Sequence, residues 1–274
     1  MSETRWVHGD YKVADGTRLH YVEMGAGTPV ILIHGAGGSA VGNWFANGIA
    51  PALAPTNRVV GIDMRGHGLS EAGPAGGRGK MADDVIEFLD QKRIERAHIG
   101  GYSMGGGVTL SLLARCPDRF ITASFQGSGI GEIEAWRDRV PADKEPRDPE
   151  ADAARAAYQE RRAARGEEVG NDAAAFAGAQ ASPDQLRAAR ERMMQRRQQM
   201  LETLDLARVD FPVLAINGEF DRPLAKTHRM WRELASFTNV VLPGKGHLSA
   251  VMPGFIPAEY VVRLQQFIAS NNPR

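Results

Sequence analysis

The stretch Ala97-His98-Ile99-Gly100-Gly101-Tyr102-Ser103-Met104-Gly105 decides the fold, because it places one serine between glycines where two apolar runs meet. Its first part is typical of a short buried strand, and residues 108–113 begin an apolar stripe with helical spacing. Ser103 is therefore predicted to lie on a sharp strand-to-helix turn that exposes its hydroxyl group. Glycines on both sides are needed because the chain passes too close there to accommodate a Cβ atom.

The rest of the chain offers partners for this serine. A serine hydroxyl is a poor nucleophile at neutral pH, and it needs an imidazole as base and a carboxylate that orients the imidazole. Residues 211–216 and 240–242 read as two further buried strands, and Asp221 and His247 follow them. The chain order is thus serine, acid, histidine, each after a predicted strand. We predict that Ser103, Asp221 and His247 form a catalytic triad.

Two upstream motifs complete a pattern that resembles the α/β-hydrolase family over nearly the whole chain. Residues 29–38, PVILIHGAGG, look like the family's strand and H-G-x-G-G oxyanion loop, and residues 59–70, VVGIDMRGHGLS, are similar to its D-x-R-G-H-G-x-S segment. The resemblance implies an α/β-hydrolase fold, with a mostly parallel central sheet, helices on both faces and an inserted helical cap. Its catalytic groups lie on loops at the carboxyl ends of the strands.

An oxyanion hole is expected beside the triad, because acyl transfer places negative charge on a former carbonyl oxygen. Met104 follows the serine at a helix N-terminus and is predicted to supply one backbone donor. In the resemblance the second donor comes from Ala36, which follows His34-Gly35. Gly37 remains an alternative, since the extra glycine leaves the register of the loop open.

Other residues compete for these roles. His34 and His67 lie in family motifs, and we expect each to brace a loop through ring hydrogen bonds rather than to move protons. The remaining histidines are interpreted as structural: His8, His20, His98 and His228. Glu219 rivals Asp221 as the acid because it lies two residues earlier, but the family spacing G-x-x-D selects Asp221.

The chain is expected to divide into a core of residues 1–131 and 206–274 and a helical cap of residues 132–205. Residues 11–23 read as a hairpin turning at Asp15-Gly16, residues 71–80 as a loop, and residues 81–91 as an amphipathic helix. The inserted segment is rich in Ala, Arg, Gln and Glu and lacks the Val/Ile runs of sheet strands.

Within the cap we expect helices over residues 149–165 and 171–180, and a longer one that starts at Ser182-Pro183-Asp184 and runs toward Leu204. Its apolar side chains either face a substrate pocket or pack the cap on the core, and the sequence leaves both interpretations open. The candidate pocket residues are His34, Gly35, Met193, Met194, Met200, Leu201 and Leu248.

Composition limits the function classes. The formal net charge of the 274 residues is +0, which argues against a nucleic-acid partner. No apolar run approaches membrane-spanning length, so we expect no membrane partner and a cytoplasmic enzyme. The single cysteine, Cys116, excludes an internal disulfide, and no Cys or His pair has metal-ligand spacing. No metal or other cofactor is expected, and a homodimer is compatible with these features.

These features favour hydrolysis of a small-molecule carboxylic ester through an acyl-enzyme intermediate. Relatives with the same serine turn cleave enol-lactones or carbon-carbon bonds of aromatic ring-fission products, and perhydrolase or haloperoxidase side activity uses the same triad. Leu248 stands where carbon-carbon hydrolases often carry a tryptophan, which favours esters. A ligand receptor that closes its cap around a slowly hydrolysed ligand is the non-enzymatic alternative.

Overall fold

The computed structural model describes residues 6–74, 77–131, 148–164 and 183–273. Within these ranges an eight-stranded sheet has the order β1-β2-β4-β3-β5-β6-β7-β8. The strands are β1 (Val7–Lys12), β2 (Arg18–Met24), β3 (Thr28–Ile33), β4 (Asn57–Ile62), β5 (Ala97–Tyr102), β6 (Phe120–Gln126), β7 (Val213–Gly218) and β8 (Phe237–Leu242). Strands β1 and β2 pair as the predicted hairpin, β2 is antiparallel to β4, and all pairs from β4 to β8 are parallel.

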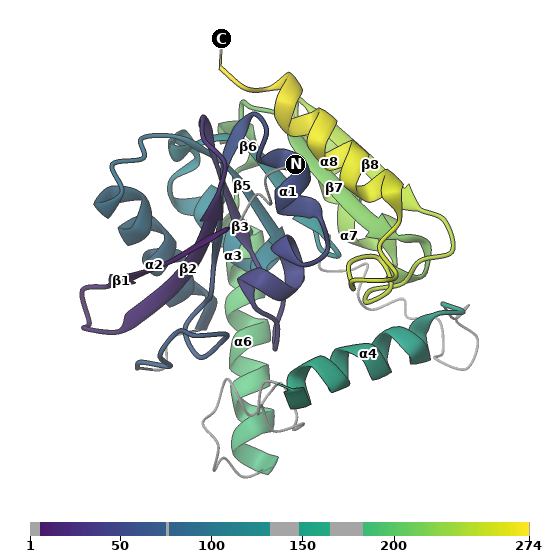
Figure 1. Cartoon of the computed structure of the whole chain (residues 1–274). Helices are drawn as coiled ribbons and strands as arrows, with labels where there is room; N and C mark the ends of the chain where they lie inside the picture. Colours follow the sequence, from purple (N-terminus) through teal and green to yellow (C-terminus); the bar gives the residue numbers. More distant parts are fainter. Residues whose placement is uncertain (1–5, 75–76, 132–147, 165–182, 274) are drawn as a thin grey trace.

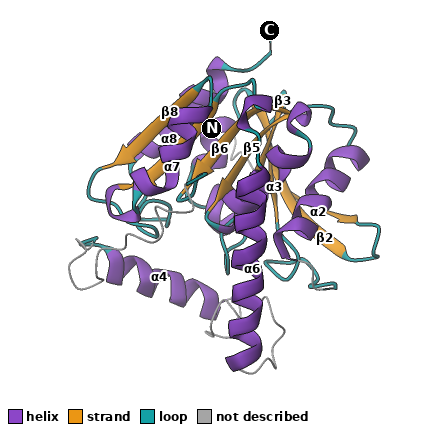
Figure 2. Ribbon diagram, turned by 180° about the vertical axis from the view of Figure 1, so that it is seen from behind, coloured by secondary structure: helices purple, strands orange, loops and turns teal. Residues whose placement is uncertain are grey.

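Helices cover both faces of this sheet (Figures 1 and 2). The helices are α1 (Ile49–Leu53), α2 (Gly77–Gln91), α3 (Met104–Arg115), α4 (Ala151–Ala164), α6 (Pro183–Thr203), α7 (Pro223–Glu233) and α8 (Ala258–Ser270). Side chains of α2, α3 and α7 share one core cluster with the sheet, and those of α1 and α8 share the other. The chain therefore has the predicted α/β-hydrolase architecture of a mostly parallel sheet between two helical layers.

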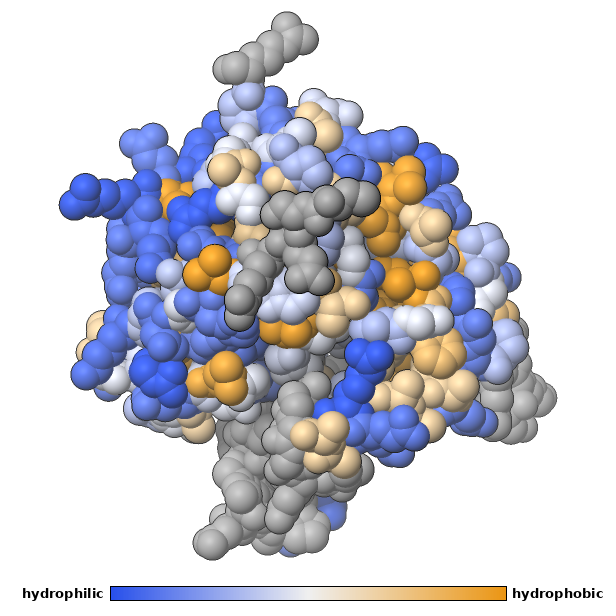
Figure 3. All heavy atoms as spheres, viewed as in Figure 1, coloured by the Kyte–Doolittle hydropathy of each residue, from blue (hydrophilic) through white to orange (hydrophobic). Residues whose placement is uncertain are grey.

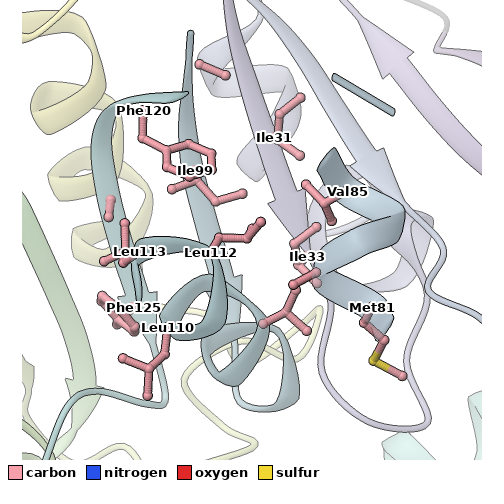
Figure 4. Close-up of a cluster of buried hydrophobic side chains, with 14 of the residues drawn as sticks. Ile31, Ile33, Met81, Val85, Ile99, Leu110, Leu112, Leu113, Phe120 and Phe125 are labelled. Atoms are coloured by element: carbon pink, nitrogen blue, oxygen red, sulfur yellow. The ribbon is translucent and has the colours of Figure 1, made fainter. Parts of the chain in front are cut away.

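The apolar runs of the sequence become strands because a parallel strand between two helical layers is buried on both faces. In β3, Ile31 and Ile33 point into the cluster with α2 and α3, whereas Val30 and Leu32 point into the cluster with α1 and α8. Figure 4 shows the first cluster, where Ile33 lies between Val85 of α2 and Leu112 of α3. This two-sided core fixes the strand ends from which the site is built.

Helix α2 begins earlier than the sequence predicts. The loop expected over residues 71–80 ends before Gly77, where the helix starts, four residues ahead of Met81. Because glycine has a low helix propensity, the sequence does not predict the first turn of α2. The buried pair of Arg65 with Asp84, at 2.6 Å, and the packing of Met81 in the core hold this end of the helix in place.

Two of the three helices predicted for the cap are confirmed. Helix α4 matches the prediction over residues 149–165, and α6 starts at the predicted Pro183. The helix expected over residues 171–180 lies outside the described residues. Helix α4 lies beyond one end of the sheet, and α6 extends past the same end (Figures 1 and 2). The division into residues 1–131, 132–205 and 206–274 stays a prediction.

Apolar side chains are mainly inside the molecule. On the face seen in Figure 3 the described surface is mostly hydrophilic, and hydrophobic residues form small groups. The exposed large hydrophobic side chains of the described residues are Val7, Leu69, Leu224, Trp231, Val241 and Val262. None of the helices in the described ranges combines the length and the apolar composition needed to cross a lipid bilayer.

One buried histidine gives the fold a testable pH dependence. His98 in β5 is fully buried, with Nδ1 2.7 Å from Thr122 Oγ1 and Nε2 3.0 Å from Asn272 Oδ1. Burial lowers the pKa of His98 from 6.5 to about 4. Because the unfolded chain takes up this proton first as the pH falls, the free energy of unfolding should fall from pH 6.5 toward pH 4, by up to roughly 3 kcal/mol.

Urea unfolding at several pH values checks this expectation. His98→Gln should lack this part of the pH dependence, whereas His228→Gln, which replaces an exposed histidine of α7, should retain it. Equal pH dependence in both variants would show that His98 is not the responsible group.

Candidate active site

Ser103 occupies a strained turn between β5 and α3. Its backbone angles are φ 52° and ψ −105°, a conformation that few residues other than glycine adopt. A Cβ atom at Gly101 would lie 2.2 Å from the carbonyl carbon of Gly105, and one at Gly105 would lie 2.1 Å from the carbonyl oxygen of Ile33. The glycines on both sides of Ser103 are therefore required by backbone contact, as the sequence predicts.

The structure brings the three predicted triad side chains into one hydrogen-bonded chain. Nε2 of His247 lies 2.9 Å from Oγ of Ser103, and Nδ1 lies 2.8 Å from Oδ2 of Asp221. Asp221 lies in the short turn after β7, and His247 lies in the loop after β8. The arrangement places a proton on Nδ1 facing the carboxylate and leaves Nε2 free to accept the serine proton.

Tyr102 supports the imidazole of His247. The sequence motifs do not predict this role. Its ring stacks on that of His247, with centroids 5.1 Å apart, and its hydroxyl donates to the His247 carbonyl oxygen at 2.6 Å. A Cβ atom at Gly127 would lie 2.7 Å from Cε2 of Tyr102 and 3.1 Å from Cε1 of His247, so a glycine is needed beside both rings. Tyr102 is adjacent to Ser103 in the chain, so one strand end positions both the serine and the histidine.

Lys226 of α7 is a second residue that sequence reasoning missed. Its Nζ lies 2.5 Å from Oδ1 of Asp221 and donates to the carbonyl oxygen of Gly127 at 3.1 Å. Burial would raise the pKa of Asp221, but the hydrogen bond from His247 and the positive charge of Lys226 outweigh it. The pKa of Asp221 therefore lies below its usual value, and the carboxylate stays ionised.

Glu219, the rival acid, lies elsewhere. It is exposed, and its Oε2 accepts a hydrogen bond from the backbone amide of Gly244 at 2.9 Å. Glu219 thus braces the loop that leads to His247, whereas Asp221 makes the contact with the imidazole. The geometry agrees with the choice of Asp221 from the spacing.

His34 holds the predicted oxyanion loop. Its Nδ1 lies 2.7 Å from the carbonyl oxygen of Gly35, and its Nε2 accepts from the amide of Met64 at 3.0 Å. These partners require a neutral ring that carries its proton on Nδ1. Among the described residues, neither the Ala36 amide nor the Met104 amide has a hydrogen-bond acceptor. Both remain available for a ligand, and the choice between Ala36 and Gly37 stays a prediction.

His67 and Asp63 brace the neighbouring segment. Nδ1 of His67 lies 3.0 Å from the Arg65 carbonyl oxygen, which agrees with the predicted bracing role. The Asp63 carboxylate accepts from the amides of Ala40 and Leu69 at 2.6 and 3.0 Å. Burial would raise the pKa of Asp63, but these bonds and the contact with His20 lower it.

Several residues predicted to line the substrate pocket are buried elsewhere in the structure. His34 is fully buried with both ring nitrogens hydrogen-bonded, so it braces the loop and does not line a pocket. Gly35 is buried against the Tyr102 ring, 2.6 Å from where its Cβ would be. Leu201 is buried in the core cluster of α2 and α3, and Met200 packs against that cluster and accepts from Ser111 Oγ at 3.6 Å.

Met200 and Leu201 therefore pack the end of α6 on the core, which corrects their assignment to the pocket. An amphipathic stripe tells which side of a helix is buried, but not which surface buries it. Leu248 is partly exposed beside His247 and remains a pocket candidate. The side chains of Met193 and Met194 lie outside the described residues.

Comparison with known proteins supports the fold and the motifs. A family model described as the alpha/beta hydrolase fold matches residues 28–145. The solved structure of a serine hydrolase involved in carbazole degradation superposes with a TM-score of 0.64 over 97% of this chain and 100% of that chain, at 21% identity. The chain therefore has the α/β-hydrolase fold.

Similarity to curated relatives is confined to part of their length. The chain is 40% identical over 121 residues to the dihydrolipoyllysine-residue acetyltransferase component of an acetoin cleaving system of Pseudomonas putida, covering 43% of this chain and 32% of the relative. It is 38% identical over 120 residues to 2-hydroxymuconate semialdehyde hydrolase of Pseudomonas sp. (strain CF600), covering 42% of each. It is 36% identical over 92 residues to esterase YbfF of Escherichia coli (strain K12), covering 34% of this chain and 35% of the relative.

Proposed function

We propose that this protein hydrolyses carboxylic esters of small molecules through an acyl-enzyme intermediate. The hydrogen-bonded chain from Ser103 through His247 to Asp221 carries the proposal. This arrangement can raise the nucleophilicity of the serine and return a proton to a leaving group. Similarity to an esterase over part of the chain supports the same class of reaction.

The reaction has two halves. Nε2 of His247 takes the proton of Ser103 Oγ as this oxygen attacks the ester carbonyl carbon. The amides of Ala36 and Met104 stabilise the oxyanion of the tetrahedral intermediate, and each such donor contributes roughly 3 kcal/mol. As the carbon-oxygen bond breaks, His247 gives the proton to the departing alcohol and the acyl-enzyme remains.

In the second half His247 removes a proton from water, and the resulting hydroxide attacks the acyl carbon. The second tetrahedral intermediate collapses with transfer of the proton to Ser103, which releases the carboxylic acid and restores the enzyme. Asp221 remains ionised throughout and stabilises the imidazolium. The inserted segment over residues 132–205, which carries α4 and α6, acts in this proposal as a cap over the site.

Carbon-carbon bond hydrolysis is the second candidate. The similarity to 2-hydroxymuconate semialdehyde hydrolase favours it. Leu248 after the histidine favours esters. Assays of the purified protein with p-nitrophenyl esters of increasing acyl length, with lactones and with aromatic ring-fission products decide between the candidates. Ester turnover that depends on Ser103 supports the proposal, and turnover of ring-fission products alone would replace it with the second candidate.

If His247 is the general base, the rate of ester hydrolysis should depend on pH. We expect kcat/KM to fall as the solution becomes acidic, because the imidazole must be neutral to accept the serine proton. Initial rates with a p-nitrophenyl ester at low substrate concentration measure this. A profile that stays flat from about pH 5 to 9 is incompatible with His247 as the base.

A further inference from the structure

Helix α4 contacts two loops of the candidate site through polar groups. Near the middle of the helix, the Tyr158 hydroxyl donates to the carbonyl oxygen of Ala36 at 2.8 Å. Just before the helix begins, Asp148 Oδ2 accepts from Ser249 Oγ at 2.6 Å, and Ser249 Oγ accepts from the Gly246 amide at 2.8 Å. The segment from Asp148 to Tyr158 therefore contacts both the loop of the predicted oxyanion donors and the loop of the histidine.

The hydrogen bond from Tyr158 holds the backbone of Ala36, and the orientation of this backbone determines where its groups point. In a trans peptide the C=O and N–H groups point in opposite directions, so a bond that fixes one fixes the other. The carbonyl oxygen of Gly35 is held by Nδ1 of His34 at 2.7 Å and by the Gly38 amide at 3.0 Å. These bonds from the core orient the peptide that carries the Ala36 amide.

The peptide that follows Ala36 is held by a residue of α4. Its carbonyl oxygen is the acceptor of the Tyr158 hydroxyl, so the two bonds together fix the backbone on both sides of Ala36. Glycines occupy positions 35, 37 and 38, and Gly37 has φ 63°, so the loop has little intrinsic stiffness. The Tyr158 bond therefore restrains the peptide that follows Ala36.

We propose that Tyr158 is a positioning residue for the oxyanion loop: its bond from helix α4 fixes the carbonyl side of Ala36, the residue whose amide is the predicted donor. This inference rests on the proposed function, because it concerns the donor that meets the tetrahedral intermediate. A donor misplaced by a fraction of an ångström loses part of its effect on the transition state and little of its effect on substrate binding. Tyr158 should therefore affect kcat and leave KM nearly unchanged.

Tyr158→Phe tests this, because it removes only the hydroxyl. We expect kcat for a p-nitrophenyl ester to fall about tenfold while KM stays within about twofold. A trifluoromethyl ketone adds to Ser103 and places its oxyanion in the same hole, so its affinity should fall by the same factor as kcat/KM. A purely structural role of the hydroxyl would not produce this match.

Tyr11→Phe is the matched control. The Tyr11 hydroxyl also donates to a backbone carbonyl oxygen, that of Asp84 at 3.2 Å, but it lies in the core cluster of α2. We expect this variant to keep the wild-type kcat and ketone affinity. Melting temperatures of both variants show whether either has lost its fold.

Three results would overturn the inference: a Tyr158→Phe variant with unchanged kcat, an equal loss in Tyr11→Phe, or a rise in KM alone, which would make Tyr158 a substrate contact. In each of these cases the wild-type enzyme still hydrolyses esters, so the proposed function survives. A wild-type protein that neither hydrolyses esters nor reacts with a fluorophosphonate would instead refute the proposed function.

Discussion

Ser103→Ala is expected to lower kcat for ester hydrolysis by roughly 10⁴ to 10⁶, because no other group can form the acyl-enzyme. A fluorophosphonate should label the wild-type protein at Ser103 and leave the variant unlabelled, as mass spectrometry of the digested protein can show. The fold should persist, because the substitution removes one partly exposed hydroxyl and leaves no cavity. Its melting temperature should accordingly stay close to that of the wild type.

Cys116 provides the necessary control, since it is the single thiol of the chain and so the other conspicuous nucleophile. It is half-buried at the end of α3, and burial raises the pKa of its thiol, which keeps it protonated and unreactive. Cys116→Ser should therefore keep both activity and labelling. Label on another residue, or near-normal hydrolysis by Ser103→Ala, would end the assignment of Ser103 as the nucleophile.

The fold can be predicted from the sequence because the glycines and apolar runs that mark its turns and strands act locally. The glycines at positions 101 and 105 are required by contacts within one turn and with the adjacent strand β3, and apolar runs mark the strands that two helical layers bury. The order of Ser103, Asp221 and His247 follows from the ends of those strands. Local signals failed at the start of α2, where Gly77 lowers helix propensity but the packing of Met81 compensates.

The supporting residues of the site could not be predicted in the same way. Tyr158 and Ala36 are 122 residues apart in the chain, and no periodicity links a helix surface to one particular loop carbonyl. Lys226 contacts Asp221 from the first turn of α7, which follows the left-handed residue Arg222 with φ 50°. Such contacts depend on how helices and strands pack together. A sequence motif indicates only the local backbone conformation that the catalytic residues require.

Asp221→Asn is expected to lower kcat by roughly 10² to 10⁴. The Asp221 carboxylate accepts the Nδ1 proton of His247 and thereby leaves Nε2 free to act on Ser103. An asparagine can present its amide NH₂ to Nδ1, which favours the tautomer with the proton on Nε2, where it blocks proton transfer from the serine. It also removes the negative charge that stabilises the imidazolium and pairs with Lys226.

Glu219→Gln separates this effect from a general loss of acidic charge after β7. Glu219 is exposed and contacts the Gly244 amide, which a glutamine side-chain oxygen can still accept, so kcat should change by less than about threefold. Steady-state kinetics of both variants with one p-nitrophenyl ester provide the comparison. If the glutamine variant loses activity and the asparagine variant does not, the acid is Glu219. The contact between Asp221 and His247 would then be structural.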